Sequence, residues 1–218
     1  MTPQWTCFLF DLDGTIVDSA PGITASLAWT FEQLGRPIPS PAELLAYVGP
    51  PILDSFRDLA GMDTDEALDA LSVYRPHYLS TGVFNSTVYP GVADLLKRIY
   101  ERGIPMSLAT SKPETPALAV LDHYGLTRYF TVITGASEDE VRSRKADVVA
   151  EALLRLGAVG TDLVRPVMIG DREHDVKGAA AHGIPTIFVG WGYGSPAEEV
   201  GTIGVAKTPG DLRTLLLG

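Results

Sequence analysis

The apolar residues of the chain follow two patterns that divide it into two parts. From about residue 90 onward, short apolar runs alternate with segments in which apolar residues recur at helical spacing. Runs of this length between turn residues are typical of buried strands, and we predict them at residues 104–109, 130–133, 167–169, 186–189 and 205–206. A further run at residues 5–10 predicts the first strand. Strands that alternate with helices favour an α/β fold with a doubly wound parallel sheet.

Residues 16–87 show the second pattern, in which apolar side chains recur at helical spacing and we identify no strand. Helices are predicted at residues 21–34, 40–47, 52–59 and 64–79. Ser40 followed by Pro41 is typical of the start of a helix, and Gly49-Pro50-Pro51 breaks the chain. We therefore predict a core domain formed by residues 1–15 and 88–218, with an all-helical domain of residues 16–87 inserted into it.

The size and charge of the chain exclude several kinds of partner. With 218 residues and a mass of 23.3 kDa, the chain can form one sizeable core and a small second domain. A formal net charge of −10 makes it a poor general binder of nucleic acid or of anionic membranes, so we expect neither as a partner. An anionic substrate must therefore be attracted by a local site or by a bound cation.

The N-terminus and the cysteine content favour a cytoplasmic protein. No apolar stretch is long enough to span a bilayer, and residues 1–5 lack the basic region and apolar core of a signal peptide. Cys7 is the only cysteine, so an internal disulfide is excluded, which fits a reducing compartment. Because Cys7 lies in the first predicted strand, we expect it to be buried rather than reactive.

Two carboxylates directly follow the first predicted strand. Asp11 and Asp13 are two residues apart, so an extended backbone points both side chains the same way. Ligands of open α/β sheets bind beyond the carboxyl ends of the strands, and Gly14 allows the chain to turn away there. Taken alone, an Asp-x-Asp pair also fits a strand end followed by a solvated turn. Its meaning therefore depends on the polar clusters further along the chain.

Polar residues also follow two of the other predicted strands. Thr110-Ser111-Lys112 comes after the strand at 104–109, where hydroxyl and backbone N–H groups suit a phosphate oxygen. A simple turn or helix cap fits this cluster equally well. Asp171 and Asp175 follow the strand at 167–169 with i, i+4 spacing, which places them on one side of a helical turn. A divalent metal would relieve their repulsion, and capping of the helix N-terminus is the alternative.

Lys145 is the candidate cation for a phosphate oxygen. It lies near a predicted helix start, after a polar loop. A solvated surface lysine is the alternative reading. Arg142 and Arg144 lie close by in sequence, so composition alone leaves open which of the three cations acts in a site.

The order of these motifs is more specific than any one of them. Asp-x-Asp-Gly-Thr at residues 11–15 precedes Thr110, Lys145 and Gly-Asp-x-x-x-Asp at residues 170–175, each at or near the end of a core strand. In this order the chain resembles the haloacid dehalogenase (HAD) superfamily, most of whose members are phosphatases. The helical insert resembles the first class of cap domain in that superfamily. Finer features resemble its phosphoglycolate phosphatase-like branch and bacterial 5'-nucleotidase-like relatives, namely Gly49-Pro50-Pro51, Thr110-Ser111-Lys112-Pro113, Gly170-Asp171-Arg172-Glu173-His174-Asp175 and Gly192-Tyr193-Gly194-Ser195.

The resemblance implies a Rossmann-like core with a helical cap, and a reaction. The reaction is hydrolysis of a phosphomonoester through an aspartyl-phosphate, with Asp11 as nucleophile and Asp13 as general acid and base. By the same resemblance, Mg²⁺ would bind to Asp11, to the backbone carbonyl of Asp13 and to Asp171. Asp175 would orient these metal ligands, directly or through water.

The resemblance also implies how the site tolerates its charges. A carboxylate that attacks a phosphate at ~4 Å meets a repulsion of about 4 kcal/mol at an effective dielectric constant of about 20. This repulsion corresponds to roughly three powers of ten in rate. Lys145, Thr110 and Ser111 would bind phosphate oxygens and so reduce it, together with the metal. In the cap, Arg57 lies soonest after Gly49-Pro50-Pro51, and we predict a substrate contact there, with a solvated helix face as the alternative.

The substrate is predicted as a class. A small phosphorylated metabolite is expected as the partner, with phosphoglycolate first and nucleoside monophosphates as the alternative. The chain is expected to act as a monomer or a homodimer.

Other functions on the same fold are less consistent with the residues. A dehalogenase does not need Asp13, and a phosphonoacetaldehyde hydrolase-like enzyme needs a cap lysine that residues 16–87 lack. A sugar phosphomutase would share the core residues. A non-catalytic phosphate-ligand binding or regulatory protein is the alternative of another class, although binding alone does not need Asp13.

Overall fold

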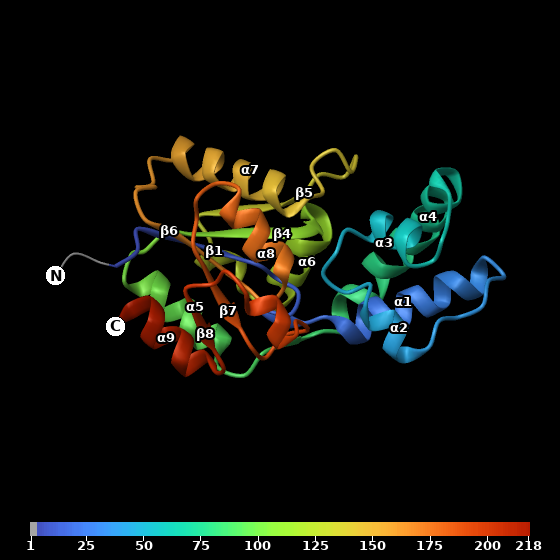
Figure 1. The fold of residues 1–218 in the computed structure, drawn as a ribbon, viewed down its shortest axis with the longest axis horizontal. Helices are drawn as coiled ribbons and strands as arrows, with labels where there is room; N and C mark the ends of the chain where they lie inside the picture. The colour runs from blue at the N-terminus through green and yellow to red at the C-terminus, as the bar shows by residue number, and fades with distance from the viewer. Residues whose placement is uncertain (1–3) are drawn as a thin grey trace.

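The computed structural model describes residues 4–218 and contains a six-stranded parallel sheet (Figure 1). The strands are β1 (Cys7–Phe10), β4 (Met106–Pro113), β5 (Val132–Ala136), β6 (Pro166–Gly170), β7 (Thr186–Val189) and β8 (Gly204–Ala206). They lie in the order β5-β4-β1-β6-β7-β8, and each neighbouring pair is parallel. This arrangement confirms the predicted α/β fold with a doubly wound sheet.

Each face of the sheet is covered by its own helices. The core helices are α5 (Val92–Glu101), α6 (Glu114–His123), α7 (Lys145–Ala158), α8 (Glu173–Ala180) and α9 (Pro209–Leu217), with short 3-10 helices η2 (Thr127–Tyr129) and η3 (Pro196–Glu199). On β1, Cys7 and Leu9 pack with α7 and α8, whereas Phe8 and Phe10 pack with α5, α6 and α9. Figure 1 shows α7 above the sheet and α5 and α9 below it. Because β1 is buried on both faces, its sequence is a continuous apolar run.

The helices that precede residue 81 form a separate group beyond one end of the sheet (Figure 1). They are α1 (Ala20–Gln33), α2 (Pro41–Leu45), α3 (Ile52–Asp58) and α4 (Thr64–Ser80), followed by a 3-10 turn, η1 (Gly82–Phe84). The fully buried ring of Phe56 lies at the centre of this group, with the ring centroids of Phe31, Tyr47 and Tyr74 at 6.2–6.3 Å. Edge-on aromatic contacts of this kind hold short helices together that could not be stable alone.

Two very short strands join this helical group to the core. β2 (Val17–Asp18) pairs antiparallel with β3 (Thr87–Val88). The prediction that residues 16–87 contain no strand is therefore wrong, because a two-residue strand is too short to show an alternating pattern. The two chain connections run side by side at this ladder.

Two predicted boundaries in the core also need correction. β4 runs to Pro113 instead of ending at Ala109, so Thr110-Ser111-Lys112 lies within the strand, where the register against β5 shifts. The sequence predicts a helix over residues 145–156 that Gly157 closes, since glycine commonly follows a helix end. In the structure, α7 includes Gly157 and ends at Ala158. A single glycine weakens a helix by only about 1 kcal/mol relative to alanine, so packing can carry the helix through it.

Residues 1–3, which belong to the stretch used to predict a protein without a signal peptide, lie outside the described residues. Within residues 4–218, no helix combines the length and the apolar character that crossing a membrane requires.

Two glycine-to-alanine substitutions should change stability in opposite directions. A Cβ at Gly22 of α1 would lie 2.0 Å from the backbone oxygen of Gly82, so Gly22→Ala should lower the free energy of unfolding by about 1–3 kcal/mol. A Cβ at Gly157 would meet only Leu163 Cδ1 at 3.6 Å, so Gly157→Ala should raise it by about 0.5–1 kcal/mol. Denaturant unfolding followed by circular dichroism measures both. A Gly22→Ala variant as stable as the wild type would contradict the close approach of α1 and η1.

Candidate active site

The predicted core-site residues gather where the strand order of the sheet reverses. β4 and β5 lie on one side of β1, and β6, β7 and β8 lie on the other. Open α/β sheets bind ligands beyond the strand ends at such a point. Each of the following residues comes from the end of β1, β4 or β6 or the start of α7 or α8, and none is more than 7% exposed: Asp11, Asp13, Thr110, Ser111, Lys145, Asp171 and Asp175.

A tight turn after β1 positions the first two carboxylates. The backbone N–H of Asp11 donates to the carbonyl of Ile169 at 2.9 Å, which ties the end of β1 to β6. The N–H of Gly14 donates to the carbonyl of Val17 at 2.8 Å and closes the turn. Gly14 has φ of +82°, and a Cβ there would lie 2.2 Å from Asp171 Oδ2. Glycine is therefore required both by the backbone conformation and by the approach of Asp171.

Lys145, the first residue of α7, joins two of the carboxylates. Its Nζ lies 2.8 Å from Asp11 Oδ1 and 2.7 Å from Asp175 Oδ1, and it donates to the carbonyl of Ala109 at 3.0 Å. Burial opposes the charged ammonium, but Asp11 and Asp175 hold the pKa of Lys145 above its usual value. Lys145 is therefore an internal countercharge and not a solvated surface lysine.

Asp171 is fully buried and lies apart from every cation in the described part of the chain. Its carboxylate accepts hydrogen bonds from the backbone N–H of Tyr193 at 2.7 Å and from Thr15 Oγ1 at 3.3 Å. In residues 4–218, no lysine, arginine or histidine nitrogen lies within 4.0 Å of it. Burial raises the pKa of Asp171 well above its usual value, and the nearby charges of Asp175 and Asp11 add to this effect.

The carboxylates of Asp11, Asp171 and Asp175 can bind a divalent cation. Each offers an oxygen, and these oxygens lie within 4.8 Å of one another. Three carboxylates and the single ammonium of Lys145 leave two negative charges, which one divalent cation would balance. Burial raises the pKa of Asp11 to about 6, against the opposing effect of Lys145. Oxygen ligands of this kind suit a hard cation, so the residues present fit a metal.

Asp13 faces a different cation, Lys112. Lys112 Nζ donates to both carboxylate oxygens of Asp13, at 2.7 and 3.0 Å, and Ser19 Oγ donates to Asp13 Oδ1 at 2.5 Å. Burial opposes the charge of Lys112, but Asp13 holds the pKa of the lysine above its usual value. The sequence contained Lys112 within the Thr-Ser-Lys motif, but we assigned it no role. Its role could have been recognised from its position, because it lies in the strand next to β1 and this brings its side chain to Asp13.

Two cavities open between the helical group and the core at this point. The Asp13 cavity, of about 70 Å³ and partly open to solvent, is lined by Asp13, Ser111 and Lys112 and by helical-group residues that include Arg75 and Tyr78. The Lys145 cavity, of about 460 Å³ and more open, is lined by Lys145, Ser111 and His174 and by residues of α3. Pro50 and Pro51 line both cavities. The chain break at Gly49-Pro50-Pro51 therefore contributes to the wall of the site.

The predicted cap arginine does not line either of these cavities. Arg57 lies near the end of α3, 41% exposed, and forms an ion pair with Asp54 one helical turn earlier. The arginine that lines the Asp13 cavity is Arg75, on α4. Sequence distance from Gly49-Pro50-Pro51 was a poor guide, because α4 returns to the site from further along the chain.

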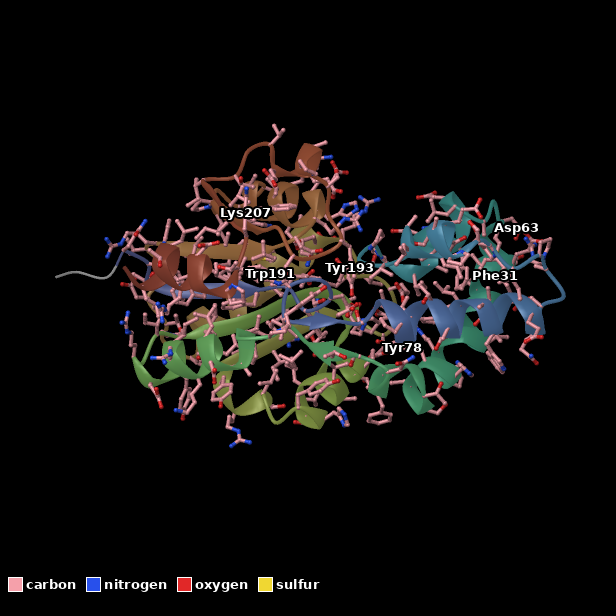
Figure 2. The ribbon with its side chains drawn as sticks, turned by 90° about the horizontal axis from the view of Figure 1, so that it is seen from below. Phe31, Asp63, Tyr78, Trp191, Tyr193 and Lys207 are labelled. Carbon is pink, nitrogen blue, oxygen red and sulfur yellow. The ribbon has the colours of Figure 1, made fainter. Side chains whose placement is uncertain are left out.

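Tyr193 connects the carboxylate cluster to the entry of the helical group. While its backbone N–H donates to Asp171, its hydroxyl accepts from the N–H groups of Ser19 and Ala20 and donates to Asp18 Oδ1 at 2.8 Å. Figure 2 shows Tyr193 where the core meets the helical group, with Trp191 further into the core and Tyr78 on the helical side. The Gly-Tyr-Gly motif therefore holds Asp171, at the end of β6, and the β2 connection together.

Comparison with known protein families gives a match over most of the chain. The family described as "Haloacid dehalogenase-like hydrolase" matches residues 8–189. A "5'-nucleotidase" of Pseudomonas aeruginosa is 36% identical over 87% of this chain and 85% of its own length. A "Phosphoglycolate phosphatase" of Pseudomonas savastanoi pv. phaseolicola is 32% identical over 96% of this chain and 78% of its own length.

Another relative carries a different name. The "Tyrosine-protein kinase PtkA" of Mycobacterium tuberculosis is 42% identical over 85% of this chain, and the match spans 62% of that protein. Among solved structures, one described as "a predicted phosphatase from Clostridium acetobutylicum" is 34% identical, covers 98% of both chains and superimposes with a TM-score of 0.91. Nearly the whole chain, including the helical group, therefore has a structural counterpart.

A divalent cation should stabilise the wild type through Asp171. With Mg²⁺ or Mn²⁺ as the probe, at about a hundredfold excess over its Kd, the melting temperature should rise by about 5–10 °C. Asp171→Asn keeps the side-chain shape but removes one charge. Without metal it should melt at or above the wild-type temperature, since a buried unbalanced carboxylate is destabilising, and with metal it should gain much less. Differential scanning calorimetry measures both.

The exposed residue Asp94 provides a matched control for this experiment. Asp94→Asn makes the same chemical change far from the cluster and should respond to metal as the wild type does. Equal metal-dependent shifts in the wild type and in Asp171→Asn would show that Asp171 does not hold the cation.

Proposed function

The chain belongs to the haloacid dehalogenase-like hydrolase family, and we propose that it is a Mg²⁺-dependent phosphatase that hydrolyses a small phosphomonoester through an aspartyl-phosphate on Asp11. The observation that carries the proposal is the charge balance at the ends of β1 and β6. The proposed nucleophile, Asp11, is buried and lies 2.8 Å from the buried Lys145, beside the carboxylates of Asp171 and Asp175. This cluster of three carboxylates and one ammonium needs two more positive charges to be neutral. A site that stabilises a dianionic phosphoryl group next to a carboxylate has this requirement.

In the proposed first step, a carboxylate oxygen of Asp11 attacks phosphorus. Lys145 reduces the repulsion between nucleophile and phosphoryl group, and its contact with Asp175 fixes the position of the ammonium. Thr110 and Ser111 donate hydrogen bonds to phosphoryl oxygens, with Ser111 at the wall shared by both cavities. Asp11, Asp171 and the backbone carbonyl of Asp13 would hold Mg²⁺, and Asp175 would orient these ligands. The cation would supply the remaining positive charge and polarise the phosphoryl group.

Asp13 is proposed as the general acid and base. It lines the cavity that would contain the leaving alcohol, and Lys112 and Ser19 hold its carboxylate in one orientation. It would give a proton to the departing alcohol oxygen and later take one from the water that hydrolyses the aspartyl-phosphate. A protein that only bound a phosphate ligand would have no use for this carboxylate.

We further propose that residues 16–87 act as a cap domain on a core of residues 1–15 and 88–218. Its two connections meet in the β2–β3 ladder, which provides a short hinge. The cap contacts the core at several points: Arg172 Nη1 donates to the Val48 carbonyl at 2.7 Å, and Lys112 Nζ lies 4.8 Å from the ring centroid of Tyr78. Closure would exclude bulk water from the reacting groups, and opening would release the product.

The relatives' names support two substrate classes, phosphoglycolate and nucleoside monophosphates. The mostly apolar wall of the Asp13 cavity, which includes Tyr74 and Tyr78, is a specific observation in favour of the second. The proposal also places the enzyme in the cytoplasm, as a monomer or homodimer that acts on a small phosphorylated metabolite.

Transfer of the phosphoryl group to a protein tyrosine is the second candidate function. The observation that favours it is the 42% identity to the mycobacterial protein named as a tyrosine kinase. An enzyme that carries a phosphoryl group on an aspartate can pass it to a hydroxyl other than that of water. Incubation with ATP and a tyrosine-containing polymer, followed by phosphotyrosine detection, tests this candidate separately from phosphate release.

A phosphate-release screen over about a hundred phosphomonoesters, with and without Mg²⁺, tests the proposal directly. At least one ester should be hydrolysed only with Mg²⁺, and Asp11→Asn should lose that turnover. Asp94→Asn, the same change at an exposed position, should retain it. If Asp11→Asn kept the wild-type rate, the assigned nucleophile would be wrong.

Asp13→Asn should separate the two chemical steps. p-Nitrophenolate leaves without a proton, so this variant should release about one equivalent of p-nitrophenol per site in a burst and then stall, because no base activates the water. With an alkyl phosphate, whose alcohol needs the proton, it should show no burst and a loss of turnover of roughly 10²-fold or more. Rapid-quench kinetics with both esters provides the measurement. An equal loss of the first step for both esters would contradict the role of Asp13 as general acid.

A further inference from the structure

The Asp13 cavity is charged where it reaches the reacting groups and mostly apolar elsewhere. Asp13 and Lys112 form its floor on the core. The rest of the wall comes largely from the helical group, and its apolar members include Ile23, Pro50, Pro51, Ile52, Tyr74 and Leu79. The rings of Tyr74 and Tyr78 are stacked, with centroids 5.5 Å apart and planes within 8°. A leaving group seated here would meet carbon and aromatic surface over most of its body.

One ion pair across this cavity joins the two parts of the chain. Arg75 of α4 pairs through Nη2 with the carboxylate of Glu140 and donates through Nη1 to the backbone carbonyl of Glu138 at 3.1 Å. All three residues line the cavity. Both terminal nitrogens of the guanidinium are thus held by the Glu138–Glu140 segment, and its charge is already neutralised at the cavity wall.

Glu140 adopts an unfavourable backbone conformation. It has φ of +62°, and in the described part of the chain it is the only residue other than glycine with a positive φ. This conformation costs on the order of 1 kcal/mol for a residue with a Cβ. The turn is closed by the Glu140 N–H, which donates to the carbonyl of Ser137 at 3.1 Å. The carboxylate is 14% exposed, so strained backbone is combined with a largely buried charge at the cavity wall.

We propose that the Arg75–Glu140 pair is a selectivity filter, which rejects phosphomonoesters whose leaving alcohol carries a carboxylate and admits those with an uncharged, flat leaving group. This inference rests on the proposed phosphatase function. A carboxylate that entered the cavity would face Glu138 and Glu140, and it could reach Arg75 only by displacing Glu140. That displacement would leave a buried carboxylate unpaired, which is costly. An uncharged ring would instead pack on the apolar wall and leave the Arg75–Glu140 pair intact.

The filter acts by repulsion as much as by attraction, as specific sites commonly do. Removal of the Glu140 charge alone should turn Arg75 from a neutralised group into a carboxylate-binding group. The predicted change is therefore a gain of activity toward acidic substrates and not a general loss.

Two esters in two variants test the proposal. The quantity is the ratio of kcat/KM for 2-phosphoglycolate to kcat/KM for phenyl phosphate, so the intrinsic reactivities of the esters cancel between variants. Glu140→Gln should raise this ratio by on the order of tenfold, because Arg75 becomes free to bind the glycolate carboxylate. Adding Arg75→Gln to Glu140→Gln should abolish the increase. An unchanged ratio in Glu140→Gln would overturn the filter.

Glu138→Gln is the matched control. It removes a charge from the same cavity, but Arg75 contacts only the backbone carbonyl of Glu138, so the Arg75–Glu140 pair stays intact. Its ratio should stay near that of the wild type. An increase equal to that of Glu140→Gln would show that the general field of the cavity, and not the ion pair, selects the substrate, and would overturn the proposal.

Binding measurements distinguish failure of the filter from failure of the proposed reaction. Isothermal titration calorimetry with both esters in the presence of Mg²⁺ gives the same ratio from affinities, in wild type and Glu140→Gln. If neither ester is turned over but Glu140→Gln still shifts the affinity ratio toward phosphoglycolate, the proposed reaction fails and the filter stands. If both are turned over and neither ratio moves, the filter fails and the reaction stands.

Discussion

The structure depends on a surplus of buried negative charge where the central strands of the sheet end. Three carboxylates converge there, and residues 4–218 supply one ammonium within reach of two of them, Asp11 and Asp175, and none for Asp171. Such a cluster is unstable on its own in a medium of low polarity, and burial accordingly raises the pKa values of Asp11 and Asp171. In the function we propose, this surplus serves a cation and a phosphoryl group.

The surrounding structure can be understood from this constraint. The sheet places β1 between β4 and β6, so that the proposed nucleophile at one strand end lies beside the hydroxyls and the proposed metal ligands of its neighbours. Gly14 allows Asp171 to approach the turn after β1, closer than any side chain there would permit. Tyr193 links Asp171 to the β2 connection, so the carboxylate cluster and the entry of the helical group share one residue. The helical group forms most of the wall of the Asp13 cavity, whose selectivity we attribute to Arg75 and Glu140.

Much of this arrangement could be predicted from the sequence because it depends on local patterns. The alternation of apolar runs and helices predicted the sheet, and Asp11, Asp13 and Asp171 were recognisable because each follows a buried strand. The structure brings these residues, with Thr110, Ser111, Lys145 and Asp175, into one site. The residues that sequence reasoning missed depend on contacts between distant segments. Lys112 reaches Asp13 across neighbouring strands, and Arg75 rather than Arg57 lines the cavity because it pairs with Glu140 of the core. The β2–β3 ladder was missed because a strand of two residues is too short to show an alternating pattern of apolar and polar residues.

The central claim is that the Asp11 carboxylate itself carries the phosphoryl group between substrate and water. Chemical trapping tests it most directly: the enzyme is mixed with substrate and Mg²⁺, quenched with acid within milliseconds, and treated with borohydride, which reduces an acyl phosphate to an alcohol. Peptide mass spectrometry should then find homoserine at position 11, only when substrate was present, and unmodified aspartate at positions 13, 171 and 175. Homoserine at another aspartate, or turnover at normal rates with no trapped residue, would contradict the claim.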